Sequence, residues 1–456
     1  MAFDTAAFWL RTNKFLMNTG IPFMPTIIKK AKGIRLYDVN DKILFDCSSG
    51  QMSSLLGHSH PEIVEVVKKS VSELDHLSSL MVSEPVVDFA EKLAQILPAP
   101  LEKSFLLNTG SESVEAAIKM AKCATGKFEI VAFSAAYHGM TQGAVSATYS
   151  HGRKWAGPLM PGQIAFPFPN SYRSRFRKPD GSYDWEAELE MGWALVDSQS
   201  VGSLAAFIFE PIMSAGGIFE PPEGYMKRMS IECKKRGMLL IADEAQTGLG
   251  RCGDMFAFQR DGIVPDILAL SKTIGCGLPV ASVSTSADIE KLALKGGYLW
   301  VTTHYNDPLA AAIASKVIDI VVRDNLVAHA AARGRQLREG LQRLQDKYWC
   351  IGDIRGRGLL LGMEIISDPV TRAPGFDIGK ALSGKALELG LACQCGASSG
   401  TCVVFRMAPP ITISAKEINQ TLNILEQSFA FVFPAESQSG IVAAVSPFGI
   451  SVEAHL

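Results

Sequence analysis

The sequence predicts an α/β fold, in which a large domain with a mostly parallel, mixed sheet flanked by helices precedes a smaller α/β domain. Between residues 104 and 286, short apolar runs alternate with helical patterns, which is typical of parallel α/β sheets. The runs are continuously apolar, as in strands that helices cover on both faces. A chain of 456 residues with 47% hydrophobic residues is also large enough for more than one core.

The first predicted element is a hairpin near the amino terminus. Residues 34–46 alternate polar and apolar side chains around Asn40 and Asp41, a pattern that predicts two strands and a tight turn. We expect this hairpin to pack against the small domain. The predicted organisation is an amino-terminal segment, a large domain, a small domain and a tail, with the ranges 1–55, 56–318, 319–435 and 436–456.

Six strands are predicted in the large domain, at SFLLN (104–108), EIVAF (129–133), LAAFIFE (204–210), MLLIADE (238–244), DILALS (266–271) and PVASVSTS (279–286). Helical patterns such as 112–124 and 224–236 lie between them. One long helix is expected from Asp307 to about Val327. The small domain then follows, with strands within 352–366 and 403–410 and a last helix near 416–433.

Composition and charge narrow the possible partners. The formal net charge is -2, the sequence pI is near 6.5, and no run of lysine or arginine occurs; the chain therefore lacks the basic footprint of proteins that bind nucleic acid or anionic membranes. No segment has the features of a membrane span or a secretory signal, so we expect a cytoplasmic protein. The final residues, Ala454-His455-Leu456, resemble a peroxisomal address, and this is the alternative location.

Polar residues follow several of the predicted strands, at the sheet edge where parallel α/β proteins bind ligands. The strand SFLLN leads into Thr109, Gly110 and Ser111, which open a helix. Free N–H groups in a first helical turn can bind a phosphate, although Ser111 alone could be an ordinary N-cap. The chain has neither a GxxxxGK[ST] loop nor a GxGxxG opening a helix, which argues against a nucleotide site.

Asp243 ends the strand MLLIADE, Gln246 follows it, and Lys272 follows DILALS. We expect three neighbouring strand ends to present a phosphate cradle, an acid and a lysine. This combination suits pyridoxal phosphate, for which a lysine forms the Schiff base and an aspartate holds the ring nitrogen protonated. Tyr137, beside His138, could stack on the ring, although a tyrosine there could equally be a core residue.

Motifs along the chain to about residue 433 resemble the class III (subgroup II) pyridoxal-phosphate aminotransferases of fold type I. They include NTGSESVEAAIKMAK, AAYHGMT, LIADEAQTGLGR, LALSKTIGCGLP and TTHYNDPLAAA. Within that family, CSSGQMSSLLGHSHPEI, LDHLSSLMVSEPVVD and VVFRMAPP are most similar to the decarboxylating branch, the 2,2-dialkylglycine decarboxylases.

The resemblance implies roles for individual residues. Lys272 would be the Schiff-base lysine and proton shuttle, Asp243 would pair with the ring nitrogen, and Gln246 would reach the ring hydroxyl. Gly110 and Ser111 would hold the phosphate together with Thr303 of the partner subunit in a homodimer or a dimer of dimers. The cofactor-contacting set is completed by Thr109, Tyr137, His138, Glu210 and Ala245.

Two further residues concern the substrate. The resemblance assigns Arg406 to the substrate carboxylate, for which the planar guanidinium fork is suited, and Gln51 to a carboxylate that stands upright on the cofactor ring before it leaves as carbon dioxide. The sequence is therefore interpreted as a decarboxylating transaminase that returns the amino group to a keto acid such as pyruvate. The alternatives are an ordinary class III aminotransferase for an amino or ω-amino acid, and a catalytically silent binding protein with the same fold.

The resemblance also implies a monovalent cation, K⁺ or Na⁺, near the active site. The matching residues are Leu77, Ser79, Thr303, Tyr305 and Asp307.

Overall fold

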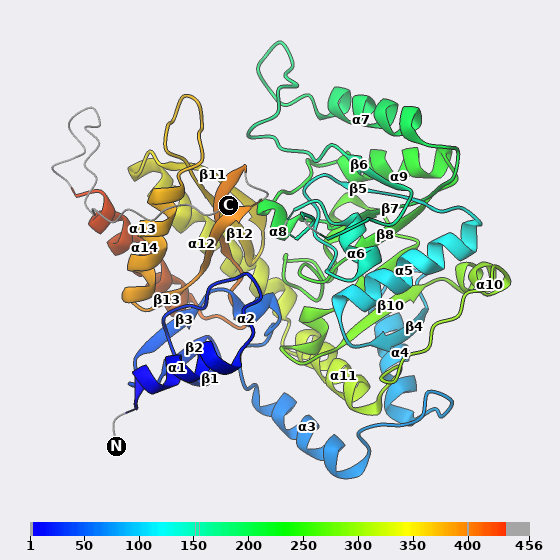
Figure 1. Ribbon diagram of the computed structural model, residues 1–456, viewed down its shortest axis with the longest axis horizontal. Helices are drawn as coiled ribbons and strands as arrows, with labels where there is room; N and C mark the ends of the chain where they lie inside the picture. The colour runs from blue at the N-terminus through cyan, green and yellow to red at the C-terminus, as the bar shows by residue number, and fades with distance from the viewer. Residues whose placement is uncertain (1–2, 151, 155, 399–400, 435–456) are drawn as a thin grey trace.

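The computed structural model describes residues 3–434, apart from 151, 155, 399 and 400. The whole predicted tail (436–456), including the peroxisome-like residues 454–456, lies outside the described residues. Two lobes stand side by side in Figure 1, with a small sheet from the amino-terminal segment below one of them. Among the described helices, none combines the length and apolar content that crossing a bilayer requires.

A seven-stranded sheet forms the large lobe. Its order is β4-β10-β9-β8-β7-β5-β6, and β10 alone runs in the opposite direction to the other strands. The predicted mostly parallel, mixed sheet is therefore confirmed. The strands are β4 Lys103–Leu107, β10 Ala281–Thr285, β9 Ile267–Leu270, β8 Leu239–Asp243, β7 Leu204–Phe209, β5 Glu129–Phe133 and β6 Gln163–Phe166. β6 has only four residues and is not predicted from the sequence.

Helices cover both faces of this sheet (Figure 1). In β5, Ile130 and Ala132 pack into the core cluster that contains residues of α5, whereas Val131 and Phe133 pack into the larger cluster on the opposite face. Every residue of β5 is buried, which explains the continuous apolar run. The helices of this lobe are α3 Pro61–Glu73, α4 Glu84–Ile96, α5 Gly110–Thr125, α6 Gln142–Ala147, α7 Trp185–Gln199, α8 Ser214–Gly217, α9 Tyr225–Lys235, α10 Ala287–Lys295 and α11 Pro308–Arg323, with 3-10 turns at Ala257–Asp261 and Lys272–Gly275.

The helix predicted from Asp307 to about Val327 is confirmed for most of its length, but it ends at Arg323. The chain forms α11, turns at Asp324 and Asn325, and continues as α12 (Leu326–Lys347). Asn325 has φ 50°, a left-handed conformation that asparagine adopts more readily than most residues. The helical pattern therefore continues through a change of direction that periodicity alone does not reveal.

The small lobe pairs β11 (Ile351–Arg357) with β12 (Leu360–Ile365), and β12 with β15 (Cys402–Met407), whose other edge binds β14 (Gln394–Ser398). The other elements are α13 Phe376–Glu388, β13 Leu391–Ala392 and α14 Ala415–Val432. The strands within 352–366 and 403–410 and the last helix are thus confirmed.

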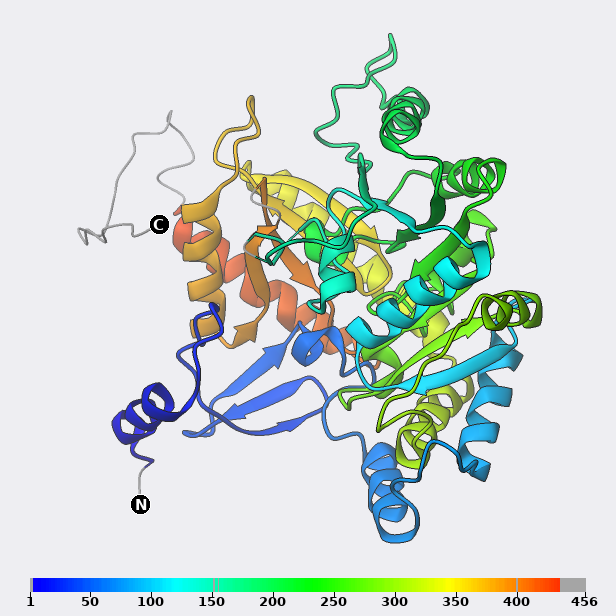
Figure 2. The ribbon, with the colours of Figure 1, turned by 45° about the vertical axis from the view of Figure 1, so that its right-hand side comes forward.

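The amino-terminal hairpin is confirmed as well. β2 (Arg35–Asp38) pairs antiparallel with β3 (Ile43–Asp46), β1 (Ile28–Lys32) adds to β2, and β13 of the small lobe adds to β3. Figure 2 shows this sheet beside the helices of the small lobe. The segment is completed by α1 (Thr5–Phe15) and the short α2 (Ser49–Met52).

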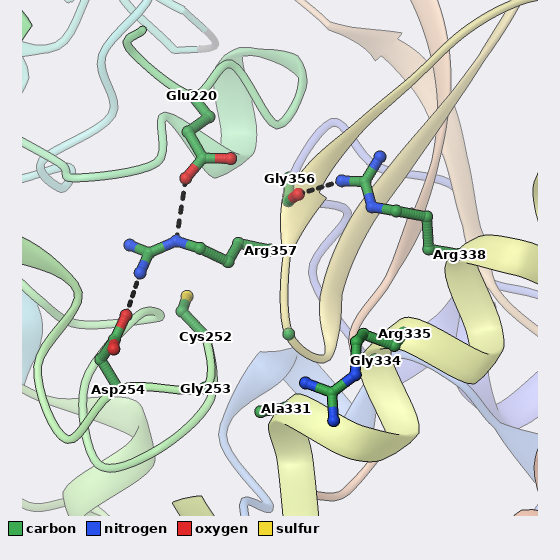
Figure 3. Close-up of a pocket in the computed structure, with 11 residues that line it drawn as sticks. Glu220, Cys252, Gly253, Asp254, Ala331, Gly334, Arg335, Arg338, Gly356 and Arg357 are labelled. Carbon is green, nitrogen blue, oxygen red and sulfur yellow. Dashed lines mark hydrogen bonds and ion pairs between the residues drawn. The ribbon is translucent and has the colours of Figure 1, made fainter. Parts of the chain in front are cut away.

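A cavity of about 400 Å³ lies where the small lobe meets the large one (Figure 3). Arg357 of β11 reaches across to Glu220, at 2.9 Å, and to Asp254, while Arg338 of α12 donates to the carbonyl of Gly356. None of the predicted site residues lines this cavity. We assign Arg357 to holding the two lobes together, whereas the contact of Arg338 lies within the small lobe.

Candidate active site

Asp243 and Lys272 lie at neighbouring strand ends, as the sequence predicts. β8 and β9 are parallel neighbours in which Asp243 pairs with Ala269, and Lys272 follows β9 after one serine. Asp243 is buried; its Oδ2 lies 2.8 Å from Nδ1 of His138, and its Oδ1 accepts the N–H of Ala245 at 3.1 Å. A buried carboxylate held from two sides keeps lone pairs for one more donor.

Lys272 occupies an electrostatically distinct position. Burial lowers the pKa of its ammonium, the carboxylates of Asp243 and Glu210 act against that shift, and the guanidinium of Arg406 adds to it. These charges are therefore close enough to interact. Lys272 also has φ 44°, and a non-glycine residue in this region costs about 1–3 kcal/mol, a strain that clusters at functional sites.

Glu210, at the end of β7, is buried beside the Asp243–His138 pair. Its carboxylate accepts the N–H groups of Tyr137 at 2.9 Å and Ser214 at 3.2 Å. Burial raises the pKa of Glu210 to about 7; the charge of His138 and the two N–H groups oppose this shift, whereas Asp243 adds to it. Glu210 thereby fixes the backbone that presents Tyr137, which is half-buried.

The first turn of α5 leaves two backbone donors for an anion. Glu112 Oε2 accepts the N–H groups of Asn108 and Thr109, and Thr109 Oγ1 accepts that of Glu112. Within the described part of the chain, the N–H groups of Gly110 and Ser111 have no acceptor. A side chain at Gly110 would place its Cβ 2.7 Å from Ser271 Oγ, so glycine is required for this close approach.

One expectation about this site is wrong. The strand before Gly110, β4, does not neighbour β9, because β10 lies between them. The helix start nevertheless reaches Ser271, the residue before Lys272.

Gln246 and Ser214 form a second polar contact. Ser214 Oγ donates to Gln246 Oε1 at 2.7 Å, and both residues are buried. Because the amide oxygen already accepts a hydrogen bond, the amide NH₂ group of Gln246 remains as a donor. A donor here suits a ring hydroxyl or phenolate.

Gln51 and Arg406 are brought together through a residue that the sequence analysis missed. Arg406 donates to Gln394 Oε1, and Gln394 Nε2 donates to Gln51 Oε1 at 3.2 Å. Gln394 precedes a cysteine in LACQCG, and only its pairing with Arg406 across β14 and β15 reveals its place. Ser271 was also missed, although its position directly before the lysine was a usable signal.

The residues predicted to hold a cation are partly connected. Ser79 Oγ donates to the carbonyl of Thr302 at 3.2 Å. Both oxygens of Asp307 are engaged by imidazoles that were not in the predicted set, His76 at 2.6 Å and His304 at 2.5 Å. Within the described part of the chain, no hydrogen bond or ion pair joins Leu77, Thr303 or Tyr305 to this group.

The donor set fits pyridoxal phosphate. Among the described residues, the N–H groups of Gly110 and Ser111 face no acceptor and the buried Ser271 hydroxyl has no partner. Asp243 retains lone pairs beside a lysine of lowered pKa. The fold and this site define a pyridoxal-phosphate-dependent enzyme of fold type I.

Comparison with known proteins identifies the family. Residues 16–429 match the family model described as aminotransferase class III. An uncharacterized aminotransferase of Schizosaccharomyces pombe is 47% identical over 96% of this chain and 97% of its own length, and the diaminobutyrate–2-oxoglutarate aminotransferase of Rhizobium meliloti is 35% identical over 89% and 88%. A crystal structure of an (S)-enantioselective ω-transaminase from Thermomicrobium roseum superposes with a TM-score of 0.86 at 28% identity, covering 95% of this chain and 100% of that one.

The chain therefore belongs to the class III aminotransferases, which are pyridoxal-phosphate-dependent enzymes acting on small amino and keto acids. These comparisons support the family, but not the closer resemblance to the 2,2-dialkylglycine decarboxylases. They favour the ordinary aminotransferase, which was the alternative from the sequence.

Proposed function

We propose that this enzyme transfers an amino group from an amino acid or ω-amino acid to a keto acid without decarboxylation. The observation that carries the proposal is that Asp243 and Lys272 lie at the ends of the parallel neighbours β8 and β9. Arg406 of β15 in the small lobe faces the same site, since its charge acts on Lys272. The relatives support it, because one is named a diaminobutyrate–2-oxoglutarate aminotransferase and another an ω-transaminase.

The cofactor contacts follow from the free donors and acceptors of the site. Gly110, Ser111 and Ser271 would bind the phosphate, Asp243 the ring nitrogen and Gln246 the ring oxygen, with Tyr137 against the ring face. Thr109, His138, Glu210 and Ala245 would hold these groups in place. When bound, pyridoxal phosphate supplies an electron sink for the bond broken at the substrate carbon.

Lys272 is the proposed covalent anchor and proton carrier. Its lowered pKa increases the fraction of neutral amine near neutral pH, and only the neutral amine can attack a carbonyl or take up a proton. Arg406 would orient the substrate through its carboxylate, and a fixed orientation decides which bond stands perpendicular to the ring.

A second candidate is the decarboxylating transaminase. It is favoured by the Gln51 amide, which is joined to Arg406 through Gln394 and could hold a carboxylate upright. A donor with two alkyl groups on its α-carbon has no hydrogen there to lose, so carbon dioxide release is its route through the same site.

One assay separates the two candidates. Purified holoenzyme is given L-alanine, an ω-amino acid or 2-aminoisobutyrate with a keto acid acceptor, and both keto product and carbon dioxide are measured. We expect product from the first two donors and no carbon dioxide. Carbon dioxide from 2-aminoisobutyrate at a rate matching alanine turnover would support the decarboxylase instead.

Three further features belong to the proposal. A homodimer or dimer of dimers would bring Thr303 of the partner subunit to the phosphate. A monovalent cation, K⁺ or Na⁺, would bind near Ser79 and Asp307; exchanging K⁺ for tetramethylammonium should then lower the melting temperature. The proposed location is the cytoplasm, and a fluorescent fusion with a free carboxyl terminus tests the peroxisomal alternative.

A further inference from the structure

Three polar side chains form a connected row between the amino-terminal segment and the small lobe. Gln394 lies opposite Arg406 in the β14–β15 ladder. Arg406 donates to Gln394 Oε1, and Gln394 Nε2 donates to Gln51 Oε1 at 3.2 Å. Because an amide has one accepting end and one donating end, a row of this kind has a direction.

The guanidinium sets that direction. Arginine has only donors, so Gln394 must turn its oxygen toward Arg406 and its NH₂ group toward Gln51. Gln51 must then accept with its own oxygen, which turns its NH₂ group away from Gln394. The orientations of both amides are thus fixed by hydrogen-bond chemistry.

The backbone around Gln51 is held independently of any ligand. Asp46 accepts the N–H groups of Ser48 at 2.9 Å and Gly50 at 2.6 Å, and Ser48 Oγ accepts the N–H of Gln394 at 3.1 Å. Gly50 has φ 66° and ψ -117°, a conformation that glycine adopts far more readily than other residues. The turn and β14 are therefore fixed to each other before a substrate arrives.

We propose that Gln394 is a positioning residue that orients the Gln51 amide, so that Arg406 and Gln51 together present only hydrogen-bond donors to the substrate. A donor-only receptor matches a carboxylate, which has only acceptors. This inference rests on the proposed function and adds to it a residue that positions the receptor for the carboxylate of the amino acid substrate.

The test reverses the direction of the row. In Gln394→Glu, the carboxylate has only acceptors, so it accepts from Arg406 and also from the Gln51 NH₂ group, and Gln51 turns its oxygen toward the substrate. Holoenzyme is titrated with propionate and with propionamide, and the change in visible absorption gives each dissociation constant. Loss of a charge-assisted hydrogen bond should weaken propionate binding at least about tenfold, whereas propionamide binding weakens less or improves.

Two controls separate this effect from general damage. Gln336 on α12 has the same kind of contacts, since its Oε1 accepts from Arg333 at 2.6 Å and its Nε2 donates to Asn419 at 2.8 Å. Gln336→Glu should leave both dissociation constants unchanged. In a Gln51→Ala background, Gln394→Glu should weaken propionate binding by a smaller factor than in the wild type, because the amide through which it acts is absent.

The assignment of Gln394 would be overturned if Gln394→Glu weakened the binding of propionate and propionamide equally. It would also be overturned if the substitution weakened propionate binding by the same factor in the wild type and in the Gln51→Ala background. The proposed function is judged separately. Keto product formation together with a failed Gln394 test would leave the aminotransferase proposal standing. If propionate binding changes as expected but no donor gives a keto product, the proposed function is contradicted. The role of Gln394 in carboxylate binding would then still stand.

Discussion

At Glu210, burial produces a pH dependence of stability. Burial raises the pKa of Glu210 from 4.5, the ordinary value expected in the unfolded chain, to about 7 in the folded protein. Between these two pH values the folded chain keeps a proton that the unfolded chain has released. Stability therefore falls as pH rises through this window and stays lower above it. The contribution is on the order of 3 kcal/mol at most.

Glu210→Gln should remove this dependence in the apo-protein. As pH rises from about 5 to about 8, the free energy of unfolding of the wild type, measured by denaturant titration, should fall relative to that of the variant. The exposed Glu339 on α12 provides the control, because Glu339→Gln removes a carboxylate that lies in solvent and is not buried. A constant difference between Glu210→Gln and the wild type at all pH values would contradict the explanation.

Ser271 provides a prediction about the phosphate. Its buried hydroxyl has no partner among the described residues, so Ser271→Ala should leave the melting temperature of the apo-protein nearly unchanged. If the hydroxyl binds phosphate, the dissociation constant of pyridoxal phosphate should rise about tenfold or more. An unchanged dissociation constant, measured by fluorescence titration, would remove Ser271 from the site.

At the residue scale, the sequence predicts Lys272 and Asp243 because each follows an apolar strand, and strand ends converge in a parallel sheet. It does not predict Gln394, since its role depends on antiparallel pairing between β14 and β15. β14 has only five residues, and the sequence does not predict it as a partner of the next strand. His76 is not predicted for a different reason, because it meets Asp307 across more than two hundred residues.

At the element scale, the start of α5 combines a capping function with the proposed binding function. Thr109→Ala removes the hydroxyl that accepts the N–H of Glu112, a loss that costs about 0.5–2 kcal/mol. Unlike Ser271→Ala, it should lower the melting temperature of the apo-protein and also weaken pyridoxal phosphate binding. Weaker binding with an unchanged melting temperature would show that the capping box does not stabilise the helix.

The elements themselves are mostly predictable, because apolar runs identify buried strands well. Two of the differences from the prediction have clear physical reasons. β6 (Gln163–Phe166) has alternating burial and only four residues, which is too short for a clear pattern. The α11–α12 turn interrupts no hydrophobic pattern, because the left-handed Asn325 redirects the chain without a proline or glycine.

For the whole molecule, the sequence predicts two lobes but not how they are joined. β13 of the small lobe extends the amino-terminal sheet, and Arg357 pairs with Glu220 and Asp254 of the large lobe. Contacts between segments this far apart depend on the assembled fold.

An apolar patch on the large lobe predicts the proposed dimer. Leu80 is 94% exposed and Val301 is 67% exposed, and the two segments are joined by the bond from Ser79 to Thr302. We expect light scattering to give a mass of at least twice the 49.2 kDa of the chain. Leu80→Asp should shift the protein toward monomer, whereas Val370→Asp, at an exposed position of the small lobe, should not.

The central claim is that Lys272 carries the cofactor, and reductive trapping tests it most directly. Holoenzyme is treated with borohydride, digested and analysed by mass spectrometry. The site predicts one pyridoxyl-modified peptide containing Lys272, absent from Lys272→Ala. A modified peptide that contains a different lysine, or no modified peptide from cofactor-loaded protein, would contradict the claim.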